Sequence, residues 1–216
     1  SLCALKLAHP DHVHLNRGNH ECKALARAYG LEKEIRSKYR GPIAMKLFED
    51  VCSLFAALPL AVVVGGAPGD RVSALVVHGG IPSDGTIRLQ DIEALVGHDR
   101  EGAVAQVVCK RNGSKERKVA VEENGNHVLE DLLWSDPVPG DGSESISVNK
   151  ARKAGCTYAL GAAHAFLVRE GLTTLVRSHE VVRSGLERYE CGEQTELYTV
   201  FSSSQYPDKK GVNEAA

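Results

Sequence analysis

Three short stretches of the sequence place possible metal ligands beside small or turn-forming residues. They are Asn19-His20-Glu21, His78-Gly79-Gly80 and Ser178-His179-Glu180. Each stretch follows an apolar run that is typical of a β-strand, and ligands at the ends of neighbouring strands converge on one crevice. Imidazole and oxygen ligands suit manganese, iron or zinc. The pattern therefore predicts a metal site built from three separate segments.

Each of these stretches also has a purely structural interpretation. A single histidine at a strand end is more often hydrogen-bonded within the fold than bound to a metal, and paired glycines alone indicate a turn. The occurrence of all three stretches together favours the metal site. The zinc-protease motif HExxH is excluded, because the positions that would need histidine hold Ala24 and Arg183.

Two arginines, Arg17 and Arg177, lie beside the candidate ligands. They are either surface charges or forks of fixed donors that recognise a phosphate group. The sequence leaves both interpretations open.

The segments that must position these groups alternate between helical and strand patterns. Apolar residues at steps of three and four predict a helix that starts at Pro42 and ends at Pro59. A second helix is predicted over 161–171, a β-hairpin over 103–123, and a loop over 137–155. Strands are predicted at 12–15, 60–64, 72–80, 173–180 and 197–206. This order predicts a mixed α/β (α+β) fold.

The composition excludes several classes of function. With 43% hydrophobic and 25% charged residues over 216 positions, the chain is expected to form one globular domain. A net charge of -2 argues against nucleic-acid or anionic-membrane partners, which need clustered positive charge. No apolar run reaches the roughly 18 residues of a membrane span. Six cysteines without a CxxC pair favour a reducing compartment, so we expect a cytoplasmic or nuclear protein.

Five sequence blocks resemble, in order and spacing, the phosphoprotein phosphatases that act on phosphoserine and phosphothreonine. The blocks are "LNRGNHE", "VVHGG", "DLLWSDP", "LVRSHE" and "TVFSSSQY". The opening stretch, "YGLEKEI" and "LPLA" are most similar to the protein phosphatase 5 and EF-hand-bearing (retinal degeneration C) branches. The resemblance implies a metallophosphoesterase-like β-sandwich flanked by helices.

The resemblance also implies a two-metal centre in which a metal-activated water attacks the phosphate and no phosphoenzyme forms. The metals would be manganese, iron or zinc, and the substrates would be phosphoproteins. Asn19, His78 and His179 match the protein ligands of the second metal. His20 matches the general acid that protonates the departing serine or threonine oxygen, a task that suits an imidazole.

Further positions match the surroundings of the phosphate in this family. They are Tyr29 and Tyr206 as lining of the phosphate pocket, and Glu21 and Asp136 as support behind the ligands. The family has an arginine seven residues before the glycine that matches Gly161, and that position is Ala154 here. The neighbouring Arg152 is expected to reach the phosphate only if its loop shifts.

The family's GDxHG and GDxVDRG blocks, which carry the ligands of the first metal, are not found in this sequence. We therefore expect residues 1–216 to be one partial catalytic domain, truncated at both ends, with a hairpin insertion at about 98–128. Alone it would be inactive or weakly active, and regulatory domains or subunits would lie outside it. The alternative is a catalytically dead phosphatase-like module that serves for binding.

Overall fold

The computed structural model describes residues 2–65, 73–95, 108–109, 117–118, 127–140, 142–203, 206–208 and 211–212. Helices and strands are interspersed along these ranges, so the predicted mixed α/β class is confirmed. Among the described helices, none combines the length and hydrophobicity that crossing a bilayer requires.

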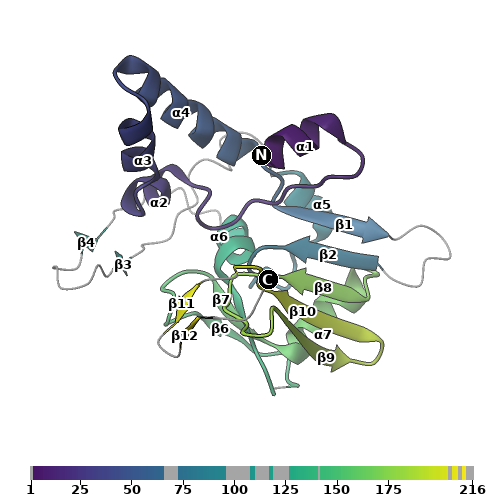
Figure 1. Cartoon of the computed structure of the whole chain (residues 1–216). Helices are drawn as coiled ribbons and strands as arrows, with labels where there is room; N and C mark the ends of the chain where they lie inside the picture. The colour runs from purple at the N-terminus through teal and green to yellow at the C-terminus, as the bar shows by residue number, and fades with distance from the viewer. Residues whose placement is uncertain are drawn as a thin grey trace.

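A five-stranded sheet forms the centre of the molecule, in the order β1-β2-β8-β10-β9 (Figure 1). The strands are β1 (Ala61–Gly65), β2 (Ser73–Val77), β8 (Thr174–Arg177), β10 (Thr195–Val200) and β9 (Leu186–Gly192). The three inner strands run parallel to one another, and the two edge strands are antiparallel to their neighbours. Because β2 and β8 are parallel neighbours, His78 and His179 follow them at the same edge of the sheet.

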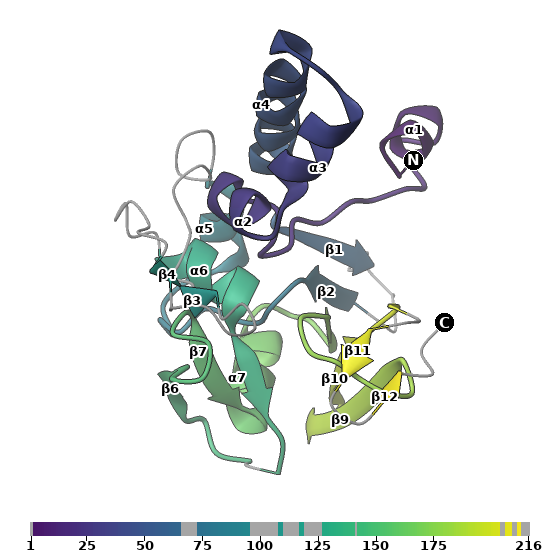
Figure 2. The same ribbon diagram turned by 60° about the vertical axis from the view of Figure 1, so that its left-hand side comes forward.

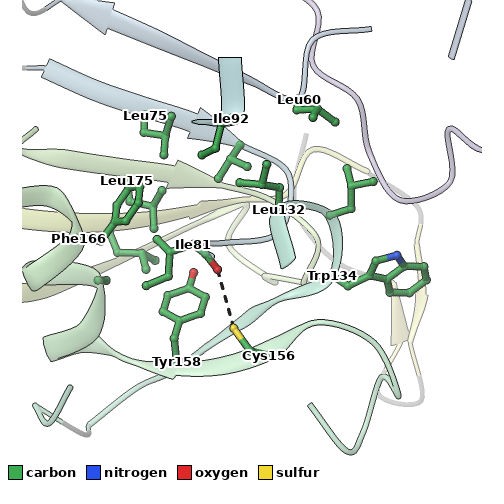
Figure 3. Close-up of a cluster of buried hydrophobic side chains, with 14 of the residues drawn as sticks. Leu60, Leu75, Ile81, Ile92, Leu132, Trp134, Cys156, Tyr158, Phe166 and Leu175 are labelled. Carbon is green, nitrogen blue, oxygen red and sulfur yellow. Dashed lines mark hydrogen bonds between the residues drawn. The ribbon is translucent and has the colours of Figure 1, made fainter. Parts of the chain in front are cut away.

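One face of this sheet carries the main hydrophobic core. Leu75, Leu175 and Leu197 occupy one row across the inner strands, and each is fully buried. They pack in one cluster with side chains of α5 (Leu89–Glu93), α6 (His127–Trp134) and α7 (Leu160–Arg169), as Figure 3 shows. Each buried leucine contributes about 1.5–3 kcal/mol relative to an exposed one. The core therefore fixes the strands from whose ends the candidate ligands project.

A smaller sheet of three strands, in the order β5-β7-β6, contributes the buried Cys156 and Tyr158 to the same hydrophobic core (Figure 3). Its strands are β5 (Asp136–Val138), β7 (Cys156–Ala159) and β6 (Ile146–Val148). The prediction of a loop over all of 137–155 is therefore wrong for the last two residues of β5 and for β6. Its three residues lie among serines and glycines, and pairing with β7 gives them a strand conformation that the local sequence does not signal.

A helical lobe stands beside the sheet, formed by α2 (Lys23–Ala28), α3 (Leu31–Lys38) and α4 (Pro42–Ala57) (Figure 2). It has a small core of its own, in which Phe48 is fully buried. The helix predicted from Pro42 is confirmed, because proline suits the first helical turn and Leu58 leaves helical geometry before Pro59.

The segment between α1 (Leu2–Ala8) and α2 contains no strand, so the strand predicted at 12–15 is wrong. Alternating apolar residues specify a face, but a strand also needs a neighbour to complete its hydrogen bonds. Here, two contacts hold the end of the segment: Arg17 N donates to Pro59 O at 2.8 Å, and Asn16 Nδ2 donates to Val76 O at 2.9 Å. The first candidate ligand is therefore positioned by a loop.

Two further strand pairs lie within the described residues. β3 (Val108–Cys109) and β4 (Arg117–Lys118) pair antiparallel, as do β11 (Pro207–Asp208) and β12 (Gly211–Val212). The turn between β3 and β4 lies outside the described residues, so the hairpin insertion at about 98–128 stays a prediction.

Candidate active site

The structure brings the three predicted ligands together from segments far apart in the chain. His78 Nε2 lies 2.9 Å from Asn19 Oδ1 and 3.2 Å from His179 Nδ1. His78 and His179 follow the parallel strands β2 and β8, and Ser178 N donates to His78 O at 3.0 Å. One nitrogen of each imidazole and the amide oxygen therefore face a common point.

Two glycines permit this close approach of backbone and ligands. A Cβ on Gly79 would lie 2.7 Å from the backbone of Leu133 and of Trp134. A Cβ on Gly18 would lie 2.5 Å from Glu21 Oε2 and 3.1 Å from His78 Nδ1. Any side chain at these positions would push the ligand segments apart, which explains the Arg17-Gly18 and His78-Gly79 pairs in the sequence.

Burial keeps both ligand imidazoles neutral. It lowers the pKa of His78 to about 4, with the charge of Arg177 acting in the same direction. It lowers the pKa of His179 to about 3, where the nearby charge of Arg152 adds to the effect. A neutral imidazole presents the lone pair that metal ligation needs.

The donor set fits a divalent cation. Among the described residues, no group of three or more His, Cys, Asp or Glu side chains is arranged to hold a metal. The cluster found here instead joins two imidazoles to an amide oxygen, ligand types that manganese, iron and zinc accept. His179 Nε2, the nitrogen on the other side of that ring, is buried without a hydrogen-bond partner.

A buried ionic network supports the ligands from behind. Asp136 Oδ1 lies 4.0 Å from His179 Nε2 and accepts a hydrogen bond from Arg177 Nη2 at 2.9 Å. Asn149 Nδ2 and Arg152 Nε both donate to Asp136 Oδ2 at 2.9 Å. Burial opposes ionisation of Asp136, but the hydrogen bond and charge of Arg152 outweigh it and lower the pKa. The carboxylate is therefore ionised beside His179.

The two arginines beside the ligands are neither surface charges nor open forks for phosphate. Arg17 is 2% exposed, and its Nε donates to Glu21 O at 2.9 Å. Arg177 is 1% exposed; its Nε donates to Gly79 O, and its Nη1 donates to Glu180 Oε2, both at 2.6 Å. Each joins segments of the site, a role that spacing in the sequence does not reveal.

The predicted general acid lies on an exposed part of the site. His20 is exposed, and its ring stacks on that of Tyr29 with centroids 4.7 Å apart and planes 30° apart. Glu21 Oε2 accepts a hydrogen bond from Gly18 N at 2.8 Å, which closes the loop that presents His20. Tyr206 packs edge-on against Phe201, with centroids 5.4 Å apart. The roles assigned to these residues stay predictions.

Sequence reasoning missed two residues of the site. Asn149, only 1% exposed, donates to Asp136 and accepts from Arg152 N. Trp134 meets the ring of His179 edge-on, with centroids 5.6 Å apart. An asparagine in a polar loop carries no signal of its own, whereas "DLLWSDP" placed Trp134 inside a family block without indicating its contact.

An α/β sheet that gathers two imidazoles and an amide at its strand ends, next to an exposed histidine, has the layout of a metal-dependent phosphoesterase. The comparison with family models agrees with that class. The model described as calcineurin-like phosphoesterase matches residues 1–183. The chain belongs to this family.

Comparison with individual proteins shows which members of this family are similar to the chain. The chain is 32% identical over 211 residues to serine/threonine-protein phosphatase 5 of Homo sapiens, covering 98% of this chain and 34% of that protein. For the phosphatase 5 of Arabidopsis thaliana, identity is 33% over 213 residues, covering 98% of this chain and 32% of that protein.

A Saccharomyces cerevisiae protein serine/threonine phosphatase, described as similar to human phosphatase PP5, matches with a TM-score of 0.70 and 27% identity. The match covers 98% of this chain and 54% of that one. The metallophosphoesterase fold and the resemblance to phosphatases of the protein phosphatase 5 type are therefore confirmed. The chain spans about a third of the length of the curated relatives.

Proposed function

We propose that this chain carries the ligands of one metal and the general acid of a protein phosphatase that hydrolyses phosphoserine and phosphothreonine. The observation that carries the proposal is the convergence of Asn19 Oδ1, His78 Nε2 and His179 Nδ1 at 2.9 and 3.2 Å. The names of the relatives support the substrate class.

These three atoms would hold a divalent cation such as manganese, iron or zinc. A cation in such a site polarises the phosphate oxygens and makes water a nucleophile near neutral pH. The chain contributes the geometry: parallel strands fix the two histidines, and the loop before α2 brings in Asn19. The side-chain amide of Asn19 is uncharged, so it would neutralise none of the positive charge with which the cation attracts a dianionic phosphate.

Asp136 orients one ligand. Because Nδ1 of His179 faces the ligand point, the ring proton belongs on Nε2, which points toward the carboxylate 4.0 Å away. At this distance the carboxylate acts through its negative charge, which favours the tautomer with the proton on the nitrogen that faces it. Arg177 and Asn149 hold this carboxylate in place.

His20 donates a proton to the departing oxygen of serine or threonine. Its exposed position lets it reach a protein substrate, and the stack on Tyr29 limits the orientations of its ring. A departing alkoxide needs this proton far more than p-nitrophenolate does, because p-nitrophenol is a much stronger acid than an alcohol.

The test compares a phosphoserine peptide and p-nitrophenyl phosphate as substrates of wild type and His20→Ala, each with added manganese chloride. We expect weak manganese-dependent hydrolysis, in which His20→Ala slows the peptide reaction about 100-fold or more and the p-nitrophenyl reaction much less. His14→Ala, a change at an exposed histidine, is the control and should behave as wild type. Equal losses on both substrates would contradict the role of His20.

A binding module remains the second candidate, favoured by the buried Ala154 at the position of the family's arginine. It predicts that wild type binds the phosphopeptide in manganese without releasing phosphate. Hydrolysis that depends on His20 excludes this candidate.

A further inference from the structure

We propose that the turn between α3 and α4 is a docking site for an acidic segment of a partner protein. The turn lies at the end of the helical lobe that points away from the sheet (Figure 1 and Figure 2). The proposed docking site is therefore separate from the candidate ligands at the strand ends. The inference goes beyond the proposed function, because it concerns binding at a second surface and does not depend on hydrolysis.

A groove of about 420 Å³ opens at this turn. Among the described residues, none that lines the groove is acidic. Gly41 reverses the chain here with φ 66° and ψ -153°, a conformation that is nearly restricted to glycine. The reversal leaves the two preceding residues exposed at the end of the lobe. The lining side chains come from both helices and the turn: Arg36, Tyr39, Arg40, Pro42, Ala44 and Met45.

Tyr39 and Arg40 present an aromatic ring and a free cation at this groove. Tyr39 is 47% exposed. Arg40 is also exposed, and its guanidinium makes no hydrogen bond or ion pair within the part of the chain that the structure describes. Tyrosine and arginine are enriched at protein interfaces, and a guanidinium binds a carboxylate through two parallel hydrogen bonds. The groove therefore suits a segment that brings a carboxylate to Arg40 and an apolar group to Tyr39.

The helical lobe is basic, although the whole chain carries a negative net charge. Residues 23–57 contain seven lysines and arginines and four aspartates and glutamates, which gives a net charge of +3, whereas the chain as a whole has -2. All four of these carboxylates already pair with lysines or arginines of the lobe. The remaining positive charge attracts an acidic partner at close range, within a screening length of about 8 Å at physiological ionic strength.

The shape and charge of the groove favour a peptide segment over other anionic partners. A strongly salt-dependent complex with nucleic acid uses roughly 6–10 phosphate contacts, which exceeds the two arginines of this groove. A lipid bilayer presents a broad plane of head groups, which contacts protruding side chains and leaves a groove unfilled. An acidic peptide needs few cations, and one of its side chains can occupy the groove.

The experiment measures the binding of a fluorescein-labelled peptide by fluorescence anisotropy. In this peptide, four glutamates lie on each side of one phenylalanine. We expect the wild-type chain to bind it and Arg40→Glu to weaken binding about 10-fold to 100-fold, the range for a lost hydrogen bond between charged groups. Tyr39→Ala should weaken binding about 5-fold to 10-fold, as for other aromatic contact residues. A peptide with lysine in place of every glutamate should not bind.

Lys33→Glu is the matched control. Lys33 is an exposed residue of α3 that, like Arg40, makes no ion pair among the described residues, but it does not line the groove. Its replacement changes the charge of the lobe as much as Arg40→Glu does. It should weaken binding only about 2-fold, as expected for an exposed charge outside the contact.

An equal loss in Arg40→Glu and Lys33→Glu would overturn the inference, because it would show general attraction between charges without a groove. Absence of peptide binding by the wild-type chain would also overturn it, whether or not the chain binds vesicles of phosphatidylserine and phosphatidylcholine. Arg40→Gln removes the charge without reversing it and should also weaken binding. This variant keeps the test decisive if Arg40→Glu fails to fold.

Discussion

The candidate site has two sides that the protein holds in different ways. On the strand-end side, Asp136 and Arg177 are buried and joined by a hydrogen bond of 2.9 Å. His78 and His179 are half-buried, and their facing nitrogens lie 3.2 Å apart. On the loop side, His20 and Tyr29 are exposed, and their rings stack on each other. The strand-end side must keep atoms at ligand distances, whereas the loop side must meet a substrate.

This difference predicts that one side of the site contributes mainly to the folding stability of the protein and the other mainly to hydrolysis. Buried charges that are paired and hydrogen-bonded cost a great deal when one partner is removed. Exposed aromatic rings contribute little to the free energy of folding, so their positions can serve contact with substrate without loss of stability. Changes on the strand-end side should therefore destabilise the protein, and changes on the loop side should alter turnover alone.

Loss of Arg177 should have the largest effect. Arg177→Ala leaves the Asp136 carboxylate without its fully buried cationic partner, and we expect the free energy of unfolding to fall by about 3–5 kcal/mol in urea denaturation. Arg188→Ala, at an exposed pair with Glu190 and Glu196, serves as the control and should leave the urea midpoint unchanged. A small effect of Arg177→Ala would show that the network does not hold the strand ends.

Removal of a metal ligand should have the second largest effect. Asn19→Ala should weaken manganese binding by about 100-fold, since even residues behind a ligand contribute 10-fold to 100-fold. Calorimetric titration with manganese chloride measures the change, and His14→Ala should bind manganese as wild type does. Equal affinities in wild type and Asn19→Ala would place the metal elsewhere.

Acid should destabilise the metal-free protein through the strand-end side. Because His78 and His179 have pKa values of about 4 and about 3 when folded, the unfolded chain binds protons first as the pH falls below about 6.5. The contribution of these two histidines to the free energy of unfolding is fully present above this pH. It decreases as the pH falls toward the pKa values of the folded protein. Urea denaturation should show a fall of about 2 kcal/mol between pH 6.5 and 5.5 for the two histidines together.

A variant identifies the source of this pH dependence. His78→Gln removes one of the two groups, so its stability should fall about half as steeply over the same pH range. An unchanged slope in His78→Gln would show that other groups cause the acid sensitivity.

The loop side should give the smallest change in stability. Tyr29→Leu removes the stack on His20, and we expect the free energy of unfolding to change by less than about 1 kcal/mol. Hydrolysis of the phosphoserine peptide should fall, because the His20 ring loses its orientation. Tyr39→Leu, a change at another exposed tyrosine of the helical lobe, should leave hydrolysis unchanged. A decrease of several kcal/mol in the free energy of unfolding of Tyr29→Leu would show that the loop side also stabilises the fold, which contradicts the proposed difference between the two sides.

The elements whose signals are local could be predicted from the amino-acid sequence alone. The spacing of apolar residues and the placement of two prolines predicted α4, and apolar β-branched runs predicted β1, β2 and β8. The histidines after two of those strands were predicted to converge, and they do so at 3.2 Å. Periodicity and turn chemistry act within a few residues, so they can be read without knowledge of the fold.

The partners of those groups, in contrast, follow from the folded chain and not from any local pattern. His78 meets Asn19 from 59 positions away and His179 from 101 positions away, and no local rule specifies such pairings. The wrong prediction of a strand at 12–15 and the missed strand β6 have the same cause. A strand forms only where another strand pairs with it, and the local sequence does not show that partner. The fold likewise decided that Arg177 is fully buried while the side chain of Arg152 stays partly exposed, since an arginine in a sequence reveals neither its depth nor its acceptors.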